Sequence, residues 1–465
     1  MVTLPPLHNR TRVRVILVTT AFLLSMSISH TVRAATACAK DLLSIYRMAQ
    51  DNDPTLQAAK GTELAAFENK YLALANFLPQ ISATLDKLST HTNQNRIGTY
   101  TNNVYNLSLN QTVFNYKNWV QYAQSKNLDK QACATYADAE LNLILRTATA
   151  YFNILEAKDK LKYTIAQRDA FAKFLDQTEQ RFKVGLIAIT DVQIAKASRD
   201  NSNALVIEAI NDVENKKQIL QQIVGEKIDN IVPLREVLNL PPPEPFKIEC
   251  WVDFSLQNNW GLKAAEYNAR VSKQNIQVQA AGHLPTVNIV GNLNSNNTPS
   301  ETKLEREIRK RAGFVTNPLP AKTSSIGLQL SVPIFSGGSV VSQTRQAAYL
   351  YEQDSKRAEV VYRNVESQTR QSYLGVLSQI AQVEALKQAI VSNQSALDAT
   401  LASFNVGTRT IVDVLNSQTN LIRAQQAHAK ARYTYIIQSL TLKLFAGILS
   451  PEDICHVNSW LKLCG

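Results

Sequence analysis

Apolar residues recur at helical spacing through two very long parts of the chain. Residues 117–223 contain no proline and only one glycine, and residues 339–450 again contain no proline. Ala, Leu, Gln, Lys and Glu dominate both parts, and their apolar positions follow the three- and four-residue spacing of one helix face. A helix over 117–183 would be about 100 Å long. Because no globular domain of this mass is that long, the pattern predicts projecting, coiled helices.

Four shorter segments alternate apolar and polar residues as β-strands do. They lie at about 80–90, 104–114, 286–293 and 326–334. Strands of this length and alternation are typical of transmembrane barrels, although a half-buried soluble sheet has the same pattern. Four strands cannot close a barrel, and open edges are excluded from lipid, so a membrane location requires several chains per barrel. The apolar positions are Ile81, Ala83, Leu85, Tyr105, Leu107, Leu109, Val113, Val287, Ile289, Leu293, Ile326, Leu328, Leu330, Val332 and Ile334.

The two halves of the chain are copies of one sequence unit. The run around Gly185 recurs 222 residues later around Gly407, and the same offset relates Tyr151 to Tyr373. A fixed offset between matching landmarks predicts an internal repeat. The predicted organisation is a signal peptide at 1–37, repeat 1 at 38–232, a proline-rich linker at 233–250, repeat 2 at 251–450 and a C-terminal segment at 451–465, each repeat holding helices, one strand pair and long helices.

The N-terminus has the three parts of a signal peptide. Arginines precede an apolar run at about 15–28, and the small residues at 35–37 suit a signal peptidase. This pattern predicts export, with cleavage just before Cys38. An N-terminal membrane anchor and a lipid-modified Cys38 are the alternatives. An exported chain places its cysteines in an oxidising compartment, and an odd number leaves at least one unpaired. The sequence leaves open the pairing of Cys38, Cys133, Cys250, Cys455 and Cys464.

Charge and motif content narrow the classes of function. The net charge is +11, and because residues 1–37 hold four arginines and no acids, the remainder carries +7 without a basic run. Nucleic-acid binding therefore has no support. The chain has no HExxH, GxSxG or GxxxxGK[ST] motif, and its six histidines are scattered. We therefore predict neither an enzyme nor a cofactor or metal site.

Several segments resemble the TolC family of bacterial outer-membrane efflux proteins. They are 406–415 (VGTRTIVDVL) and its sister 184–192 (VGLIAITDV), with Asp53-Pro54, 77–80 (FLPQ) and 332–338 (VPIFSGG) in support. The resemblance extends from about residue 40 to 450. It implies an α+β membrane protein with two internal repeats, in which a long α-helical coiled-coil tunnel joins a trimeric 12-stranded transmembrane β-barrel with four strands per chain. It also implies that 233–250 and 451–465 form an equatorial region around the tunnel.

The resemblance implies an exit duct in the outer membrane, with its tunnel in the periplasm. Such a duct serves a tripartite efflux pump or a type I secretion system, and passes drugs, other small molecules or proteins. Its implied partners are two further copies of the chain, outer-membrane lipid, a periplasmic adaptor and an inner-membrane transporter of the RND or ABC type. The cargo stays open. The alternative is an exported coiled-coil structural or adhesin-like protein, which would explain the helices but not the strands.

The resemblance places a gate at the turns between the long helices. On residue chemistry alone, Gly185 and Gly407 suit a tight turn or a helix C-cap, and Asp191 and Asp413 suit the positive start of a helix. By resemblance, Arg409 bonds to Thr190 and Asp191 across helices, and Asp413 lines the pore. The tips that contact the adaptor are Gly185, Leu186, Gly407 and Thr408. The gate residues are Thr190, Asp191, Phe404, Arg409, Asp413 and Asn416.

Two gate positions depart from the family pattern. The family's well-known member has Tyr where this chain has Phe404, so a hydroxyl bond to Asp191 is lost. It also has a second pore-lining Asp where this chain has Asn416, which reduces the carboxylates in a trimer from six to three. We therefore expect a closed state that is held less tightly, and weaker cation binding at the mouth.

Overall fold

The structure is a computed structural model that describes residues 39–92, 98–236, 238, 240–297, 310–312 and 321–462. The predicted signal peptide, Cys38 and Cys464 lie outside the described residues. All the elements below belong to one unit, Ala39–Gly465. Among the described cysteines, Cys133, Cys250 and Cys455 are free thiols. Within the described ranges, no helix has a stretch that is long and apolar enough to cross a membrane.

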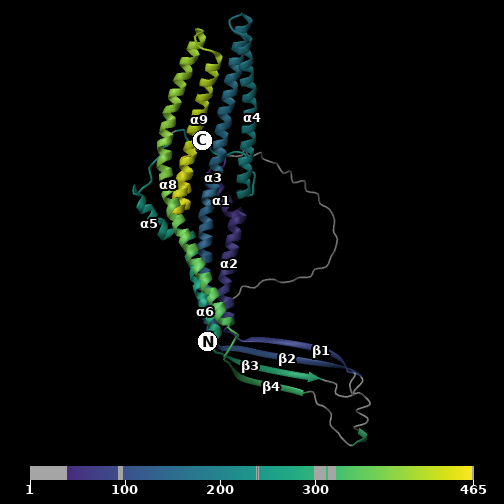
Figure 1. Cartoon of the computed structure of the whole chain (residues 1–465). Helices are drawn as coiled ribbons and strands as arrows, with labels where there is room; N and C mark the ends of the chain where they lie inside the picture. Colours follow the sequence, from purple (N-terminus) through teal and green to yellow (C-terminus); the bar gives the residue numbers. More distant parts are fainter. Residues whose placement is uncertain are drawn as a thin grey trace, which may run out of the picture. The chain divides into compact units, whose positions relative to one another are not determined.

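Two helical hairpins dominate the structure and repeat each other (Figure 1). The predicted helix over 117–183 is confirmed as α3, and its counterpart α8 differs from it by one residue in length. The side chain of Asn115 starts α3 by accepting a hydrogen bond from the Lys117 amide. Figure 1 shows the hairpins side by side, with their turns at the same end. Their helices are α3 (Tyr116–Lys183), α4 (Ile189–Val224), α8 (Ser339–Asn405) and α9 (Ile411–Phe445).

Shorter helices precede each strand pair and pack against the hairpins, and one more, α10, follows α9 near the C-terminus. Helix α2 packs on α3, and α6 packs on both α3 and α8. Asp53 and Asn259 cap α2 and α6 by accepting hydrogen bonds from the amides of Leu56 and Leu262. These helices are α1 (Leu42–Asn52), α2 (Pro54–Ala75), α5 (Ile248–Asn258), α6 (Trp260–Ala280), the 3₁₀ turn η1 (Ala281–His283) and α10 (Pro451–Asn458).

The four predicted strands form one antiparallel sheet in the order β1-β2-β3-β4. The last strand ends at Ser331 instead of the expected 334, because Pro333 has no amide hydrogen to continue the ladder. Three predicted limits were too short: β4 begins at Ala321 instead of 326, β2 begins at Gly98 instead of 104, and β3 ends at Asn297 instead of 293. Polar residues at these ends weaken the alternation. The outer edges of β1 and β4 have no partner strand among the described residues. The strands are β1 (Gln80–Thr92), β2 (Gly98–Phe114), β3 (Thr286–Asn297) and β4 (Ala321–Ser331).

The register of the sheet separates an apolar face from a polar face. Leu109 lies opposite Gly291, which lies opposite Ile326, so these three residues share one face. One residue along, Ser108 lies on the other face, where its hydroxyl is 2.7 Å from that of Ser82. Nothing in the described chain covers the apolar face, and Ile326 is 78% exposed. An uncovered face this apolar indicates contact with lipid or with another chain.

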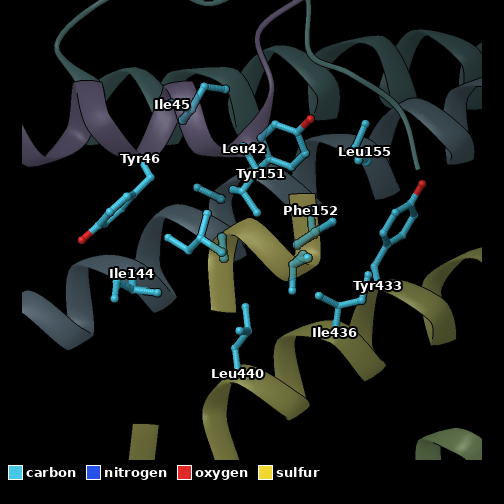
Figure 2. Packing of buried hydrophobic residues seen from close by; sticks show 14 of the residues in the cluster. Leu42, Ile45, Tyr46, Ile144, Tyr151, Phe152, Leu155, Tyr433, Ile436 and Leu440 are labelled. Carbon is cyan, nitrogen blue, oxygen red and sulfur yellow. The ribbon is translucent and has the colours of Figure 1, made fainter. Parts of the chain in front are cut away.

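The main core forms where α1, α3 and α9 meet the linker and α10. Figure 2 shows side chains from these helices, among them Tyr151, Phe152 and Ile436, filling the space between them. Two buried tyrosines hold the linker and the residue before it: the Tyr435 hydroxyl donates to the Pro241 carbonyl in the linker, and the Tyr151 hydroxyl donates to the carbonyl of Val232, which precedes the linker, each at 2.6 Å. The main core therefore holds the hairpins at positions that are distant in sequence from their turns.

Candidate functional site

The two turns between the long helices have the same backbone. In tip 1, which we define as residues 181–191, the Gly185 amide donates to the Phe182 carbonyl and the Leu186 amide donates to the Arg181 carbonyl, both at 2.9 Å. This pair of bonds is a Schellman motif, which needs a residue with positive φ. Gly185 supplies it with a φ of 79°. Nothing lies within 4 Å of a Cβ built on this glycine, so the turn requires glycine for its dihedral angles alone.

Tip 2, which we define as residues 403–416, repeats this turn 222 residues later. The Gly407 amide donates to the Phe404 carbonyl at 3.1 Å, and the Thr408 amide donates to the Ser403 carbonyl at 3.0 Å. Gly407 has a φ of 80° and is also open on all sides. The glycine that the sequence placed in each turn therefore has the same role in both tips.

The helices that leave the two turns begin differently. At tip 2, Thr410 and Asp413 form a capping box, in which the Asp413 carboxylate accepts from the Thr410 amide at 3.0 Å. The hydrogen bonds from the Thr410 amide and hydroxyl, together with the nearby Arg409 charge, hold the pKa of Asp413 below its usual value. At tip 1, Ala188 precedes α4 and offers no side-chain cap, while Asp191 lies in the first turn of the helix. Only tip 2 therefore has a side-chain lock on its outgoing helix.

The structure brings together only some of the predicted gate residues. The Arg409 guanidinium is 3.9 Å from the Asp413 carboxylate, and its side chain is 61% exposed, so this contact is a loose surface pair. Within the described chain, Arg409 forms no bond with Thr190 or Asp191, and neither of these two side chains has a hydrogen-bonding or ionic partner. Asn416 is exposed and lies almost one turn along α9 from Asp413. Among the described residues, Thr190 and Asp191 thus have no side-chain partner and Arg409 has one loose contact, so these groups are available to another chain.

Phe404 lies in a small second core close to the tips. It is 5% exposed and packs with Phe171 of α3, Ala195 of α4, and three residues of α9. This core joins the two hairpins within the chain. The α9 residues are Ile411, Val414 and Leu415.

Arg181 is a tip residue that sequence reasoning missed. Its guanidinium lies 4.4 Å from the centre of the Phe404 ring, donates to the Phe404 carbonyl at 3.3 Å, and donates to the Asn405 side-chain oxygen at 3.0 Å. One sequence feature could have drawn attention to it. The residue 222 positions later is Ser403, so the repeat is broken at a charged position beside the turn.

The tips also present apolar side chains to solvent. At tip 1, Val184 is 69% exposed and Leu186 is 73% exposed. At tip 2, Val406 is 76% exposed. Thr408 is exposed as well, although its hydroxyl donates to the Ser403 carbonyl at 3.0 Å. Exposed Leu and Val side chains on tight turns are available for contact with another protein.

The chain matches the family model described as "Outer membrane efflux protein" over residues 45–226 and 251–447. It is 34% identical over 425 residues to outer membrane protein TolC of Escherichia coli (strain K12), covering 91% of this chain and 85% of that protein. It is 25% identical over 429 residues to the alkaline protease secretion protein AprF of Pseudomonas aeruginosa, covering 90% of this chain and 86% of that protein.

Solved structures share the fold at lower sequence identity. The outer membrane channel CmeC of Campylobacter jejuni has a TM-score of 0.73 and 16% identity, over 91% of this chain and 90% of that one. The outer membrane protein VceC of Vibrio cholerae has a TM-score of 0.72 and 18% identity, over 87% of this chain and 96% of that one.

Proposed function

This chain belongs to the outer membrane efflux protein family, and on that premise we propose that its hairpin tips gate the channel. The predictions of fold class, location and broad function are confirmed: the chain is an α+β channel protein of the outer membrane, an exit duct for efflux and type I secretion rather than an enzyme. Its relatives are components of efflux and secretion systems. The gate residues, the specific partners and the domain limits given above are our proposals.

Three copies of the chain close one barrel. The sheet has an unpaired edge at β1 and another at β4, and a lipid environment does not tolerate free strand edges. Pairing β4 of one copy with β1 of the next removes both edges and gives twelve strands. The exposed apolar face then meets lipid, and the face that carries Ser82 and Ser108 lines the lumen.

A matched pair of substitutions tests this inside–outside assignment. Leu328→Lys places a charge against lipid, at a cost of about 2–4 kcal/mol per chain near the midplane, and should reduce assembly in the outer membrane. Gln329→Lys places the same charge on the other face of the same strand and should be tolerated. Heat-modifiable migration of the membrane-extracted trimer reports assembly. Equal loss of trimer for the two variants would contradict the assignment.

The free polar groups at the tips support a latch between neighbouring copies. Asp191 and Thr190 have no side-chain partner within the described chain, and Arg409 is mostly exposed with only one loose contact. We therefore assign Arg409 of each copy to Thr190 and Asp191 of its neighbour. A hydrogen bond to a charged group contributes about 1.5–3 kcal/mol, so three symmetry-related bonds would hold a channel closed. The proposal is carried by this observation: within the described chain Thr190 and Asp191 have no side-chain partner, and Arg409 has one loose ion pair, with Asp413.

Asp413 forms the electrostatic collar of the pore. An aspartate with the ordinary pKa of 3.8 is already ionised at neutral pH, and the pKa of Asp413 is lower still, so a trimer presents a ring of three carboxylates. Asn416 adds no charge to that ring, and Phe404 has no hydroxyl with which to support the closed state. We therefore expect weaker cation binding and an easier opening than six carboxylates and a tyrosine would give.

The exposed tips contact a periplasmic adaptor, which joins the duct to an inner-membrane transporter of the RND or ABC type. The contact uses Gly185, Leu186, Gly407 and Thr408, where the turns are open and apolar groups face solvent. Both small molecules and proteins fit this function, because the relatives include an efflux protein and a protease secretion protein. Cross-linking in cells, followed by capture of the duct, identifies the adaptor.

Conductance in planar bilayers tests the gate. Arg409→Ser removes the charge-assisted bonds and should raise the single-channel conductance several-fold. Arg199→Ser is the matched control, because Arg199 is exposed on α4 and pairs only with the adjacent Asp200 at 2.8 Å. The control should conduct like the unmodified trimer. Conductance that stays unchanged in Arg409→Ser, with the trimer intact, would show that the latch lies elsewhere.

A further inference from the structure

We propose that Arg181 is a positioning residue that ties tip 2 to tip 1 within each chain and thereby resists opening. This inference rests on the proposed gate, because it concerns how one side of that gate is held. Arg181 lies in the last turn of α3, whereas every group that it binds lies at the end of α8. The tie therefore adds a polar link between the two hairpins at their turns, beside the second core that also joins them.

The guanidinium contacts a ring and two oxygen acceptors at the same time. The guanidinium lies over the Phe404 ring, with 4.4 Å between its central carbon and the ring centre, and its N–H groups donate to the Phe404 carbonyl and to the Asn405 side-chain oxygen. A planar guanidinium can stack and donate together, whereas a lysine ammonium lacks the fork and the flat face. The side chain thus recognises the end of α8 by shape as well as by charge.

The charge of Arg181 also suits two helix ends. Both α3 and α8 end at this point, and a helix C-terminus carries partial negative charge and carbonyls without helical partners. Helix α3 has Arg181 and Lys183 in its last turn, but α8 has no basic residue in its own. Ser403, the counterpart of Arg181 in the repeat, cannot provide that charge. Arg181 therefore supplies a cation to both ends.

The Phe404 ring, which Arg181 covers, is itself buried in the second core. Phe404 is buried between Phe171, Ala195 and the start of α9. Moving α8 and α9 away from α3 would expose this ring and break all three Arg181 contacts together. A phenylalanine cannot hold the tips by a hydroxyl bond to Asp191, so the closed tip is held through the ring face and the backbone carbonyl.

Amide hydrogen exchange of the full-length trimer tests the tie directly. Arg181→Ala should speed exchange of the tip 2 amides at 403–410 by about tenfold, since it removes one stacked cation and two bonds. Lys183→Ala is the matched control: it removes a positive charge from the same turn, and Lys183 has no bond or ion pair to α8 among the described residues. The control should leave exchange at tip 2 unchanged. An equal effect of the two variants would overturn the proposal.

Two further variants separate the tie from a general loss of charge or packing. Arg181→Lys keeps the charge but loses the fork, so it should recover only part of the protection, and full recovery would contradict the tie. Asn405→Ala alone should speed exchange at tip 2. Added to Arg181→Ala, it should speed exchange little further, because both substitutions remove the same hydrogen bond. Additive effects would show that the two residues do not act together.

Conductance distinguishes failure of the tie from failure of the gate. Arg181→Ala should raise single-channel conductance, but less than Arg409→Ser, because the contacts between copies remain. If Arg409→Ser opens the channel and Arg181→Ala changes neither conductance nor exchange, the tie is wrong and the gate stands. If Arg181→Ala raises conductance and Arg409→Ser does not, the latch between copies is wrong and the tie stands.

Discussion

Tip 1 and tip 2 share one backbone turn and differ in the chemistry attached to it. Both turns are Schellman motifs at a glycine with φ near 80°. Tip 1 continues through Leu186, Ile187 and Ala188 into an uncapped helix, whereas tip 2 continues through polar residues into a capping box. The repeat therefore preserved the geometry that reverses the chain and let the side chains diverge. In the proposed gate, tip 1 supplies an apolar surface and the Asp191 carboxylate, which has no partner among the described residues, and tip 2 supplies the Arg409 cation and the Asp413 collar.

The largest effect should come from a bulky side chain at the glycine of either turn. Because the two turns have the same backbone, both substitutions should act alike. Gly407→Trp and Gly185→Trp should each abolish efflux, since the bulky side chain stands where we propose that an adaptor docks. The measurement is drug accumulation in cells, with trimer abundance as the reference. Gly407→Asn is the control, because asparagine tolerates positive φ at modest cost and should retain most efflux. Full efflux in both Trp variants, with normal adaptor cross-linking, would argue against docking at the tips.

Removing a carboxylate from tip 1 and from tip 2 should have different effects on the channel. Asp413→Ala should weaken block by divalent cations roughly tenfold, because the collar loses its three charges, and should open the pore little. Asp191→Ala should instead raise conductance, because Arg409 of the next copy loses its partner. Single-channel recordings with and without Mg²⁺ measure both effects. The same phenotype from the two alanine variants would erase the distinction between collar and latch.

A smaller effect should follow from exchanging the helix caps. Thr410→Ala removes the capping box of α9 and should cost about 0.5–2 kcal/mol of local stability. Ala188→Ser should gain a few tenths to about 1 kcal/mol at α4, because Ala188 already has the extended backbone of a capping residue. Hydrogen exchange of the first turns of α4 and α9 measures both. If neither substitution changes exchange there, the difference in capping does not contribute to the local stability of the two helices.

The smallest effect should be that of mild acid on tip 2. The pKa of Asp413 is lowered in the folded chain, so the stability contributed by its cap is present above the usual value of 3.8 and is lost only as pH falls through the lower folded value. Exchange protection of the first turn of α9, corrected for the intrinsic rate, should therefore be equal at pH 7 and pH 5. A loss of protection between these values would mean that Asp413 is not held by Thr410.

The fold followed from the sequence to the extent that local rules govern it. Helical periodicity without proline predicted α3 to within one residue at its start, and period-two alternation predicted all four strands. The start of β2, the end of β3 and both limits of β4 were wrong, because polar residues weaken the alternation at 98–103, 294–297 and 321–325 and the chain stays apolar after Ser331. Glycine positions predicted both turns, because positive φ is a local demand.

The candidate site was less accessible to the sequence, because its contacts are tertiary. Arg181 and Phe404 are 223 residues apart, and no local pattern pairs an arginine face with a distant ring. Resemblance drew attention to Phe404 for the hydroxyl that it lacks, whereas the structure gives it a buried role in the second core. The bond from Arg409 to Asp191 is a contact between copies in our proposal, so it depends on neighbours that one sequence does not position.

Exchange of the two charges tests the central claim that tip 2 of one copy latches onto tip 1 of the next. Arg409→Asp alone should raise the single-channel conductance several-fold, because two carboxylates then face each other across the copies. Adding Asp191→Arg restores an opposite-charge pair with its direction reversed, and conductance should return close to that of the unmodified trimer. A double variant that conducts as freely as Arg409→Asp alone, with trimers intact, would contradict the latch.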